Sequence, residues 1–267
     1  MLSIEGASYP EFRGMENLQL NYGMLRSDTL STLNYISPKT ADDFRCSNQL
    51  LEWHYLSRFE AFIRQDGYPC MGAQAAVNGK TYALGIFDGM QDYDVVPNLR
   101  DGLSQYLENV RGKASSFMTY IAIFRRDNFD DEAEFEKALW NLLSKLHAYD
   151  AKTHSWSEGV SDDPSDENFS FSIMGEPFFM VGLHPESSRK SRRFEYTAIA
   201  FNLHEQFEFL REKGRYRHLK SAIREKEMEF SGSINPMLSD FGDGLEAAQY
   251  SGRAVGKDWK CPFAPSK

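Results

Sequence analysis

The stretch Phe169-Ser-Phe-Ser-Ile-Met-Gly-Glu-Pro-Phe-Phe-Met-Val-Gly-Leu183 decides the fold. Two short apolar runs flank its Gly175-Glu176 pair, a pattern that is typical of a β-hairpin turned at the glycine. The second run ends where small and charged residues begin, so it predicts a buried strand that opens into a loop at His184. A hairpin at this place favours an antiparallel sheet.

Helical periodicity recurs elsewhere in the chain. Asp131 and Glu134 form a capping box at the start of one helix. Asn202 is expected to cap another helix, and Gly214 is expected to interrupt it. Apolar residues at helical spacing predict three amphipathic helices, at about residues 51–62, 99–110 and 135–146.

The remaining apolar runs complete a sheet. Residues 117–124 and 196–201 predict two more strands, and the Asn78-Gly79 pair predicts a second hairpin. Because hairpins and short links dominate, we expect an α+β fold with a mixed, mostly antiparallel sheet, helices packed on one face and an irregular C-terminal tail that wraps the site. Residues 1–37 are expected to form an irregular arm, and residues 38–267 a single domain.

Composition restricts the class of protein. The 267 residues carry 30 Lys and Arg against 39 Asp and Glu, and the net charge of −9 opposes unspecific attraction to nucleic acid. No apolar run approaches the roughly 20 residues of a membrane span. The three cysteines, Cys46, Cys70 and Cys261, match neither a disulfide framework nor a zinc motif. We therefore expect a cytoplasmic protein that binds neither nucleic acid nor membrane.

A basic block follows the second run of the opening stretch. Arg189, Arg192 and Arg193 give an acidic chain its densest cluster of cations. A guanidinium makes bidentate, charge-assisted bonds to a carboxylate, so these arginines suit the two propionates of haem; they would suit phosphate equally well. Alternatively, they pair with surface acids such as Glu186 and Glu195.

Three side chains could ligate a haem iron. His184 and His204 stand at the two ends of the segment that carries the 196–201 strand, and Cys261 lies in a Cys-Pro-Phe sequence near the C-terminus. A histidine would ligate through a deprotonated ring nitrogen, and a cysteine as the thiolate. The residues themselves leave the choice open.

Six motifs lie between about residue 45 and residue 263 in an ordered set: Tyr68-Pro-Cys70, Gly182–Phe194, Asn202-Leu-His-Glu-Gln-Phe207, Asn235-Pro-Met-Leu238, Gln249-Tyr-Ser-Gly-Arg253 and Cys261-Pro-Phe263. Together they resemble the YqcI/YcgG family. That family includes haem-dependent enzymes that hydroxylate a guanidine nitrogen, such as the pre-guanitoxin N-hydroxylase.

The resemblance implies a haem b monooxygenase that uses dioxygen or peroxide, with a separate reductase as electron source. His184 would be the first candidate for the iron ligand, followed by His204 and Cys261, and the three arginines would hold the propionates. Glu176 and Glu246 would orient an arginine-like guanidine substrate. Two other classes stay open: a haem-binding or gas-sensing protein without turnover, and an interaction protein whose basic loop binds an anionic partner.

Overall fold

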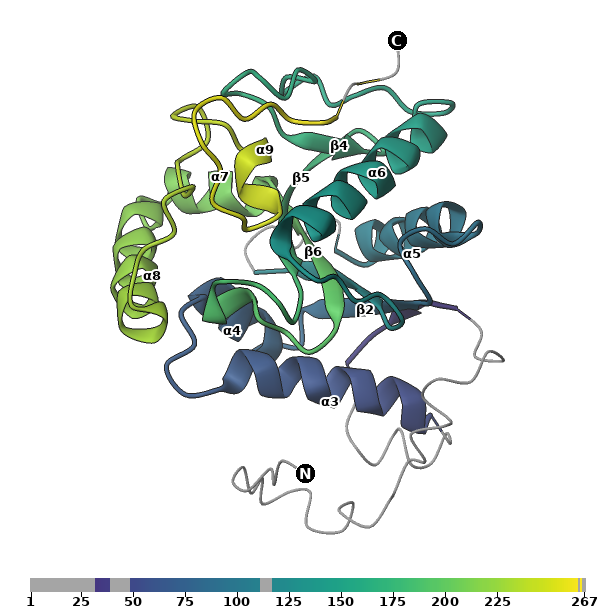
Figure 1. The fold of residues 1–267 in the computed structure, drawn as a ribbon, viewed down its shortest axis with the longest axis horizontal. Helices are drawn as coiled ribbons and strands as arrows, with labels where there is room; N and C mark the ends of the chain where they lie inside the picture. The colour runs from purple at the N-terminus through teal and green to yellow at the C-terminus, as the bar shows by residue number, and fades with distance from the viewer. Residues whose placement is uncertain (1–31, 39–48, 111–116, 264, 266–267) are drawn as a thin grey trace. The chain divides into compact units, whose positions relative to one another are not determined.

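Among the described residues, six strands form one sheet in the order β1-β2-β3-β6-β5-β4, and several of them are labelled in Figure 1. The computed structural model describes residues 32–38, 49–110, 117–263 and 265. Among the described strands, β2 and β3 pair in parallel and every other neighbouring pair is antiparallel, which confirms the expected mixed, mostly antiparallel α+β fold. The strands are β1 Leu33–Ile36, β2 Tyr82–Phe87, β3 Thr119–Phe124, β4 Phe171–Ile173, β5 Glu176–Leu183 and β6 Thr197–Leu203.

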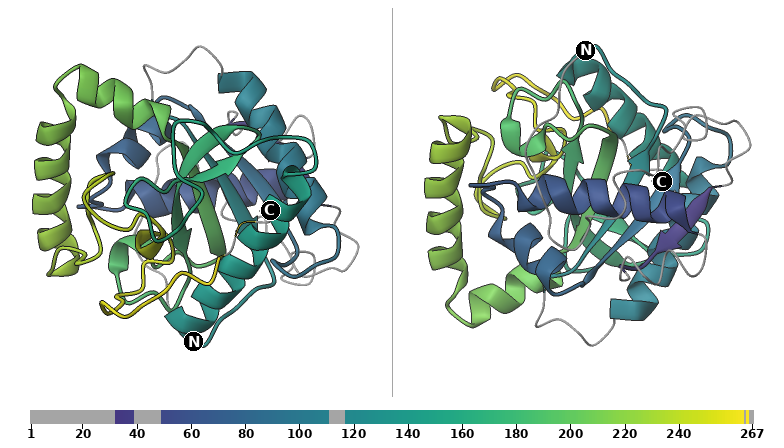
Figure 2. Two further views of the ribbon diagram at one scale, coloured as in Figure 1. Left: turned by 90° about the horizontal axis from the view of Figure 1, so that it is seen from above. Right: turned by 90° about the horizontal axis from the view of Figure 1, so that it is seen from below.

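Helices cover both faces of the sheet, and the expectation of one covered face is wrong (Figure 2). In β3, Tyr120 and Phe124 pack in one core cluster with α5 and α6, whereas Ile121 and Ile123 pack in another with α3 and α4. Alternate residues of a strand point to opposite faces, so a continuously apolar strand needs cover on both. The helices of the described residues are α3 Leu50–Arg64, α4 Met71–Asn78, α5 Val95–Val110, α6 Glu132–Asp150, α7 Glu205–Glu212, α8 Tyr216–Ser231 and α9 Ala247–Tyr250, with a 3₁₀ turn η2 at Lys190–Arg192.

The hairpin predicted from the opening stretch is present as β4 and β5. Ile173 pairs with Glu176, so the turn residues are Met174 and Gly175, one position earlier than expected. Both have positive φ, 54° and 75°, as a type I′ turn requires. The hairpin carries β5 into the sheet beside β6 and delivers His184 at its end.

The second predicted hairpin, at Asn78-Gly79, is wrong. Residues 71–78 form α4, whose N-terminus is capped by Cys70: the sulfur accepts the Ala73 N–H at 3.4 Å. Gly79 ends the helix and donates its N–H to the Ala75 carbonyl. The run of alanines around Gln74 favours a helix, and this local propensity prevails over the turn signal of the Asn-Gly pair.

Two boundaries also differ from the prediction. Asn202 lies within β6 and donates its side-chain N–H to the Phe179 carbonyl at 3.1 Å, so α7 starts after His204 instead. β1 occupies residues that were expected to be irregular. The break at Gly214 is confirmed, with φ of +67° between α7 and α8. Cys46 lies in residues 39–48 and most of the expected 1–37 arm lies in residues 1–31, and both ranges are outside the described residues.

Candidate functional site

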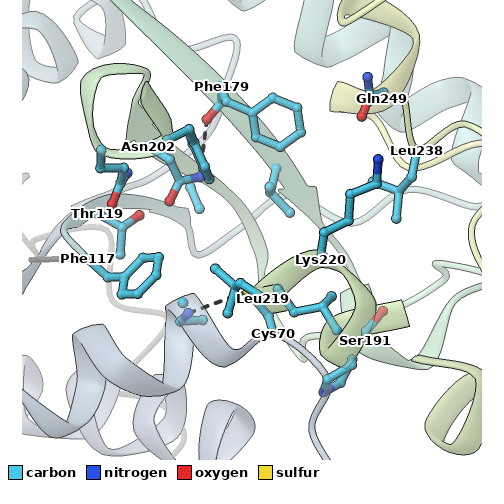
Figure 3. A pocket seen from close by; sticks show the side chains of 18 of the residues that line it. Cys70, Phe117, Thr119, Phe179, Ser191, Asn202, Leu219, Lys220, Leu238 and Gln249 are labelled. Carbon is cyan, nitrogen blue, oxygen red and sulfur yellow. Dashed lines mark hydrogen bonds between the residues drawn. The ribbon is translucent and has the colours of Figure 1, made fainter. Parts of the chain in front are cut away.

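A cavity of about 310 Å³ lies between the sheet and α8. Side chains from β5, β6, the start of α4 and residues 238–249 converge on it (Figure 3). Its volume is at the lower end of the range for small-molecule sites. Most of the wall is apolar, including Phe59, Phe179, Val181, Phe207, Leu219 and Ile223.

Helix α8 forms the outer wall of this cavity. Leu219, Ile223 and Glu227 are spaced by four residues and share the face that lines it. Glu227 accepts bonds from Arg189 and from the Ser191 hydroxyl, and Asp240 accepts bonds from Lys220 and Tyr216. Two glycines with positive φ, Gly214 and Gly232, bound the helix. These contacts fasten α8 to the rest of the protein at two places.

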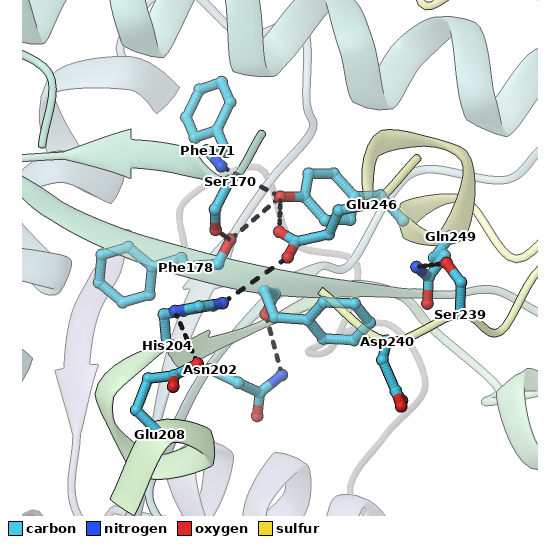
Figure 4. A network of polar contacts seen from close by, with 12 residues as sticks. Ser170, Phe171, Phe178, Asn202, His204, Glu208, Ser239, Asp240, Glu246 and Gln249 are labelled. Atoms are coloured by element: carbon cyan, nitrogen blue, oxygen red, sulfur yellow. Dashed lines mark hydrogen bonds and ion pairs between the residues drawn. The ribbon is translucent and has the colours of Figure 1, made fainter. Parts of the chain in front are cut away.

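A histidine and a buried carboxyl group meet in the inner wall (Figure 4). His204 Nε2 lies 4.0 Å from Glu246 Oε2, and its Nδ1 lies 3.9 Å from Glu208 Oε1. Burial lowers the pKa of His204, which favours the neutral imidazole. Glu246 is 3% exposed, and burial raises its pKa to about 7 although the Tyr250 hydroxyl donates to Oε1 at 2.6 Å.

The three predicted arginines have different surroundings. Arg192 lines the cavity, and its Nη1 donates to the Tyr250 carbonyl at 3.0 Å. Arg189 is buried in the ion pair with Glu227. Arg193 donates to the carbonyls of Ser187 and Ser188 and does not line the cavity. The structure therefore brings one of the three to the cavity wall.

His184 lies in the core and not at the cavity. It is fully buried, and its ring stacks on Phe135 of α6 with 4.5 Å between ring centroids. Neither ring nitrogen has a hydrogen-bond partner among the described residues. Burial lowers the pKa of His184, so the ring is kept neutral. Although both belong to the basic block, His184 lies in the core and Arg192 lies at the cavity.

Cys261 and Glu176 are also outside the cavity wall. Cys261 packs against the core cluster of α5 and α6, where burial raises the pKa of its thiol to about 12. Glu176 begins β5 at the hairpin turn. Of the eight residues predicted for the site, His204, Arg192 and Glu246 meet at the cavity.

Comparison with known proteins places the chain in a family. The model of the YqcI/YcgG family matches residues 59–264. The chain belongs to the YqcI/YcgG family. Two curated relatives, both from Bacillus subtilis (strain 168), are the uncharacterized proteins YcgG and YqcI, each 25% identical to this chain. The first match covers 82% of this chain and 91% of YcgG, and the second covers 82% and 89% of YqcI. No solved structure matches the chain.

The region matched by the YqcI/YcgG model contains every residue that lines the cavity, from Phe59 to Gln249. Some of these were not predicted: Glu227 and Lys220 sit on α8, and Asp240 precedes α9. The helical spacing along α8 could have indicated the face that carries Glu227 and Lys220. Nothing local in the sequence indicates that Asp240 reaches across to Lys220.

Proposed function

We propose that this chain is a haem-dependent monooxygenase that hydroxylates a nitrogen of a guanidine-containing small molecule. The observation that carries the proposal is a mostly apolar cavity with a nearly buried, neutral imidazole, His204, in its wall. Haem b is a largely apolar cofactor that needs one axial ligand from the protein. The resemblance of the sequence motifs to guanidine N-hydroxylases supplies the reaction class.

His204 is better placed to ligate the iron than His184 or Cys261. It lines the cavity, whereas His184 and Cys261 do not. A ligating histidine usually has its second ring nitrogen held by a carboxylate or carbonyl. The Nδ1 of His204 lies 3.9 Å from Glu208 Oε1, which is longer than a hydrogen bond but places a carboxylate beside this nitrogen when Nε2 is the iron ligand. The thiol of Cys261, with its raised pKa, is a poor source of thiolate.

Bound haem would supply the activation of dioxygen or peroxide. The apolar walls, among them Phe179 and Ile223, would exclude water from the reacting groups. Glu246 and Asp240 line the cavity and could accept N–H bonds from a guanidinium, since charge-assisted pairs of this kind are strong. Glu246 Oε2 is suited to this because Tyr250 occupies Oε1 and His204 lies beyond hydrogen-bond distance.

The overall reaction balances in either of two ways. With dioxygen, one oxygen atom is inserted into an N–H bond to give N–OH, and the other leaves as water with two electrons and two protons. The electrons would come from a separate electron-donating protein. With hydrogen peroxide, one oxygen is inserted and the other leaves as water, and no further electrons are needed.

The visible spectrum of the protein loaded with haem tests the proposal. We expect a Soret band that is lost or shifted in His204→Ala and kept in the control variant His184→Ala. The ferrous protein, given arginine-like guanidines, oxygen and a reductant, should yield a hydroxyguanidine detectable by mass spectrometry. Absence of haem uptake would refute the proposal. Haem uptake without any product across the panel would favour a haem-binding or sensing protein instead.

A further inference from the structure

Arg192 is a buried cation that faces the cavity without a carboxylate of its own. The residue is 7% exposed, and the one hydrogen bond that its guanidinium makes to the described residues goes from Nη1 to the Tyr250 carbonyl. Within residues 32–38, 49–110, 117–263 and 265, no carboxylate oxygen lies within 4.0 Å of its guanidinium. Burying a charge without a partner is unfavourable, so the arrangement calls for an anion.

The buried acid near Arg192 already binds another arginine. Glu227 is the buried carboxylate of this corner, and its Oε1 accepts from Nε and Nη2 of Arg189 and from Ser191. This corner therefore holds two buried guanidinium groups, those of Arg189 and Arg192, and the buried carboxylate of Glu227 pairs with Arg189 only. One positive charge is left in excess. Burial lowers the pKa of Arg192 to about 10, so the group still carries its charge at neutral pH.

The unbonded edge of Arg192, formed by Nε and Nη2, is the one that three other arginines of this protein use for carboxylates. In Arg58, Arg189 and Arg253, Nε and Nη2 both donate to a glutamate. In Arg192 the same two nitrogens have no acceptor among the described residues. The side chain is also seated on Gly252, where a Cβ atom would stand 2.6 Å from Arg192 Cδ. The backbone thus makes room for this guanidinium.

We infer that Arg192 binds a carboxylate group of the cavity's ligand through its Nε and Nη2 atoms. The inference rests on the proposed function only in taking this cavity as the ligand site. The carboxylate has two possible sources, a propionate of haem or the carboxylate of an amino-acid substrate, and both would make the same bidentate pair.

Two pairs of probes separate these sources. Arginine and its methyl ester are compared by calorimetry, and haem and its dimethyl ester by absorbance titration, each with the full chain. In one of the two pairs, we expect the wild type to bind the acid with a dissociation constant about 10- to 100-fold lower than that of the ester, as for a charge-assisted bidentate bond. Arg192→Gln should lose this preference. Arg193→Gln, which removes the same charge one residue away and outside the cavity wall, should keep it.

Two results would overturn the inference: an acid preference that is unchanged in Arg192→Gln, or a wild type that prefers neither acid. If circular dichroism shows that Arg192→Gln does not fold, Arg192→Lys replaces it. Lysine keeps the charge but cannot make a bidentate pair, so the preference should fall by at least about threefold, and an unchanged preference again overturns the inference.

The outcomes also separate this inference from the proposed function. A protein that takes up no haem but prefers arginine to its ester, with Arg192 responsible, would refute the monooxygenase and support the carboxylate site. A haem-loaded protein that forms hydroxyguanidine and binds each acid no better than its ester would support the monooxygenase and refute the carboxylate site.

Discussion

Glu136 on α6 holds the C-terminal segment that continues from the cavity wall, and its replacement by Gln should destabilise the protein. The carboxylate is buried, with 5% of the residue exposed. Oε1 accepts from the Ser251 hydroxyl at 3.0 Å. Oε2 accepts from Nε and Nη2 of Arg253 and from the Trp259 indole at 3.4 Å. One buried side chain therefore fastens three residues that follow α9.

The size of the effect follows from these contacts. Gln keeps one oxygen for Ser251, but its amide NH₂ would face the donors of Arg253. Removing one partner of a buried ion pair costs about 3–5 kcal/mol. Because the Arg253 side chain is 30% exposed, water partly replaces the lost partner, and we expect a loss of about 2–3 kcal/mol in the free energy of unfolding.

Urea unfolding followed by circular dichroism measures this loss. Glu134→Gln is the matched control, since it makes the same chemical change two residues away on an exposed capping box that accepts Gln as well as Glu. The control should change the free energy by no more than about 0.5 kcal/mol. A Glu136→Gln variant that is as stable as this control would contradict the structure's account of the tail.

Two further predictions concern pH and backbone conformation. Burial raises the pKa of Asp127 from 3.8 to about 6, so its ionisation opposes folding as the pH rises through 6. Asp127→Asn can still accept the Met90 N–H and should match the wild type in unfolding free energy near pH 4. Near pH 8 the variant should be more stable than the wild type by about 1 kcal/mol, a figure reduced for partial exposure. Equal stability of the two proteins at both pH values would contradict this cause. Gly232 ends α8 with φ of +77° and open space around its Cα, so Gly232→Ala should cost about 1 kcal/mol through backbone strain alone. Gly256→Ala, where no positive φ is needed and the space is equally open, is the control and should not destabilise.

The sequence predicts the fold well where local signals agree with the tertiary structure. The strand β3 and the start of α6 could be predicted because each has a local sequence pattern: a continuous apolar run in β3 and a capping box before α6. The hairpin predicted from the Asn78-Gly79 pair is wrong because these two residues end the helix α4, and Gly79 is its C-cap. The expectation that helices cover one face of the sheet rested on the hairpins and short links. The continuously apolar β3 is instead covered on both faces.

The site was harder to predict, because it depends on contacts between distant parts of the chain. His184 and Arg192 are eight positions apart and both belong to the basic block, yet the turn through η2 leaves one in the core and the other at the cavity. His204 and Glu246 come together through the sheet and α9. Such proximity has no local signature in a single sequence.

The inner face of α8 has a thermodynamic consequence. Its apolar side chains, such as Leu219 and Ile223, face a cavity instead of a packed protein layer, so the helix depends on the occupant of the cavity for part of its hydrophobic burial. Ligand affinity and the local unfolding free energy of α8 are therefore linked quantities. Any molecule that fills the cavity will slow amide hydrogen exchange in α8 more than in residues 120–124 of β3, which are packed on both faces without it.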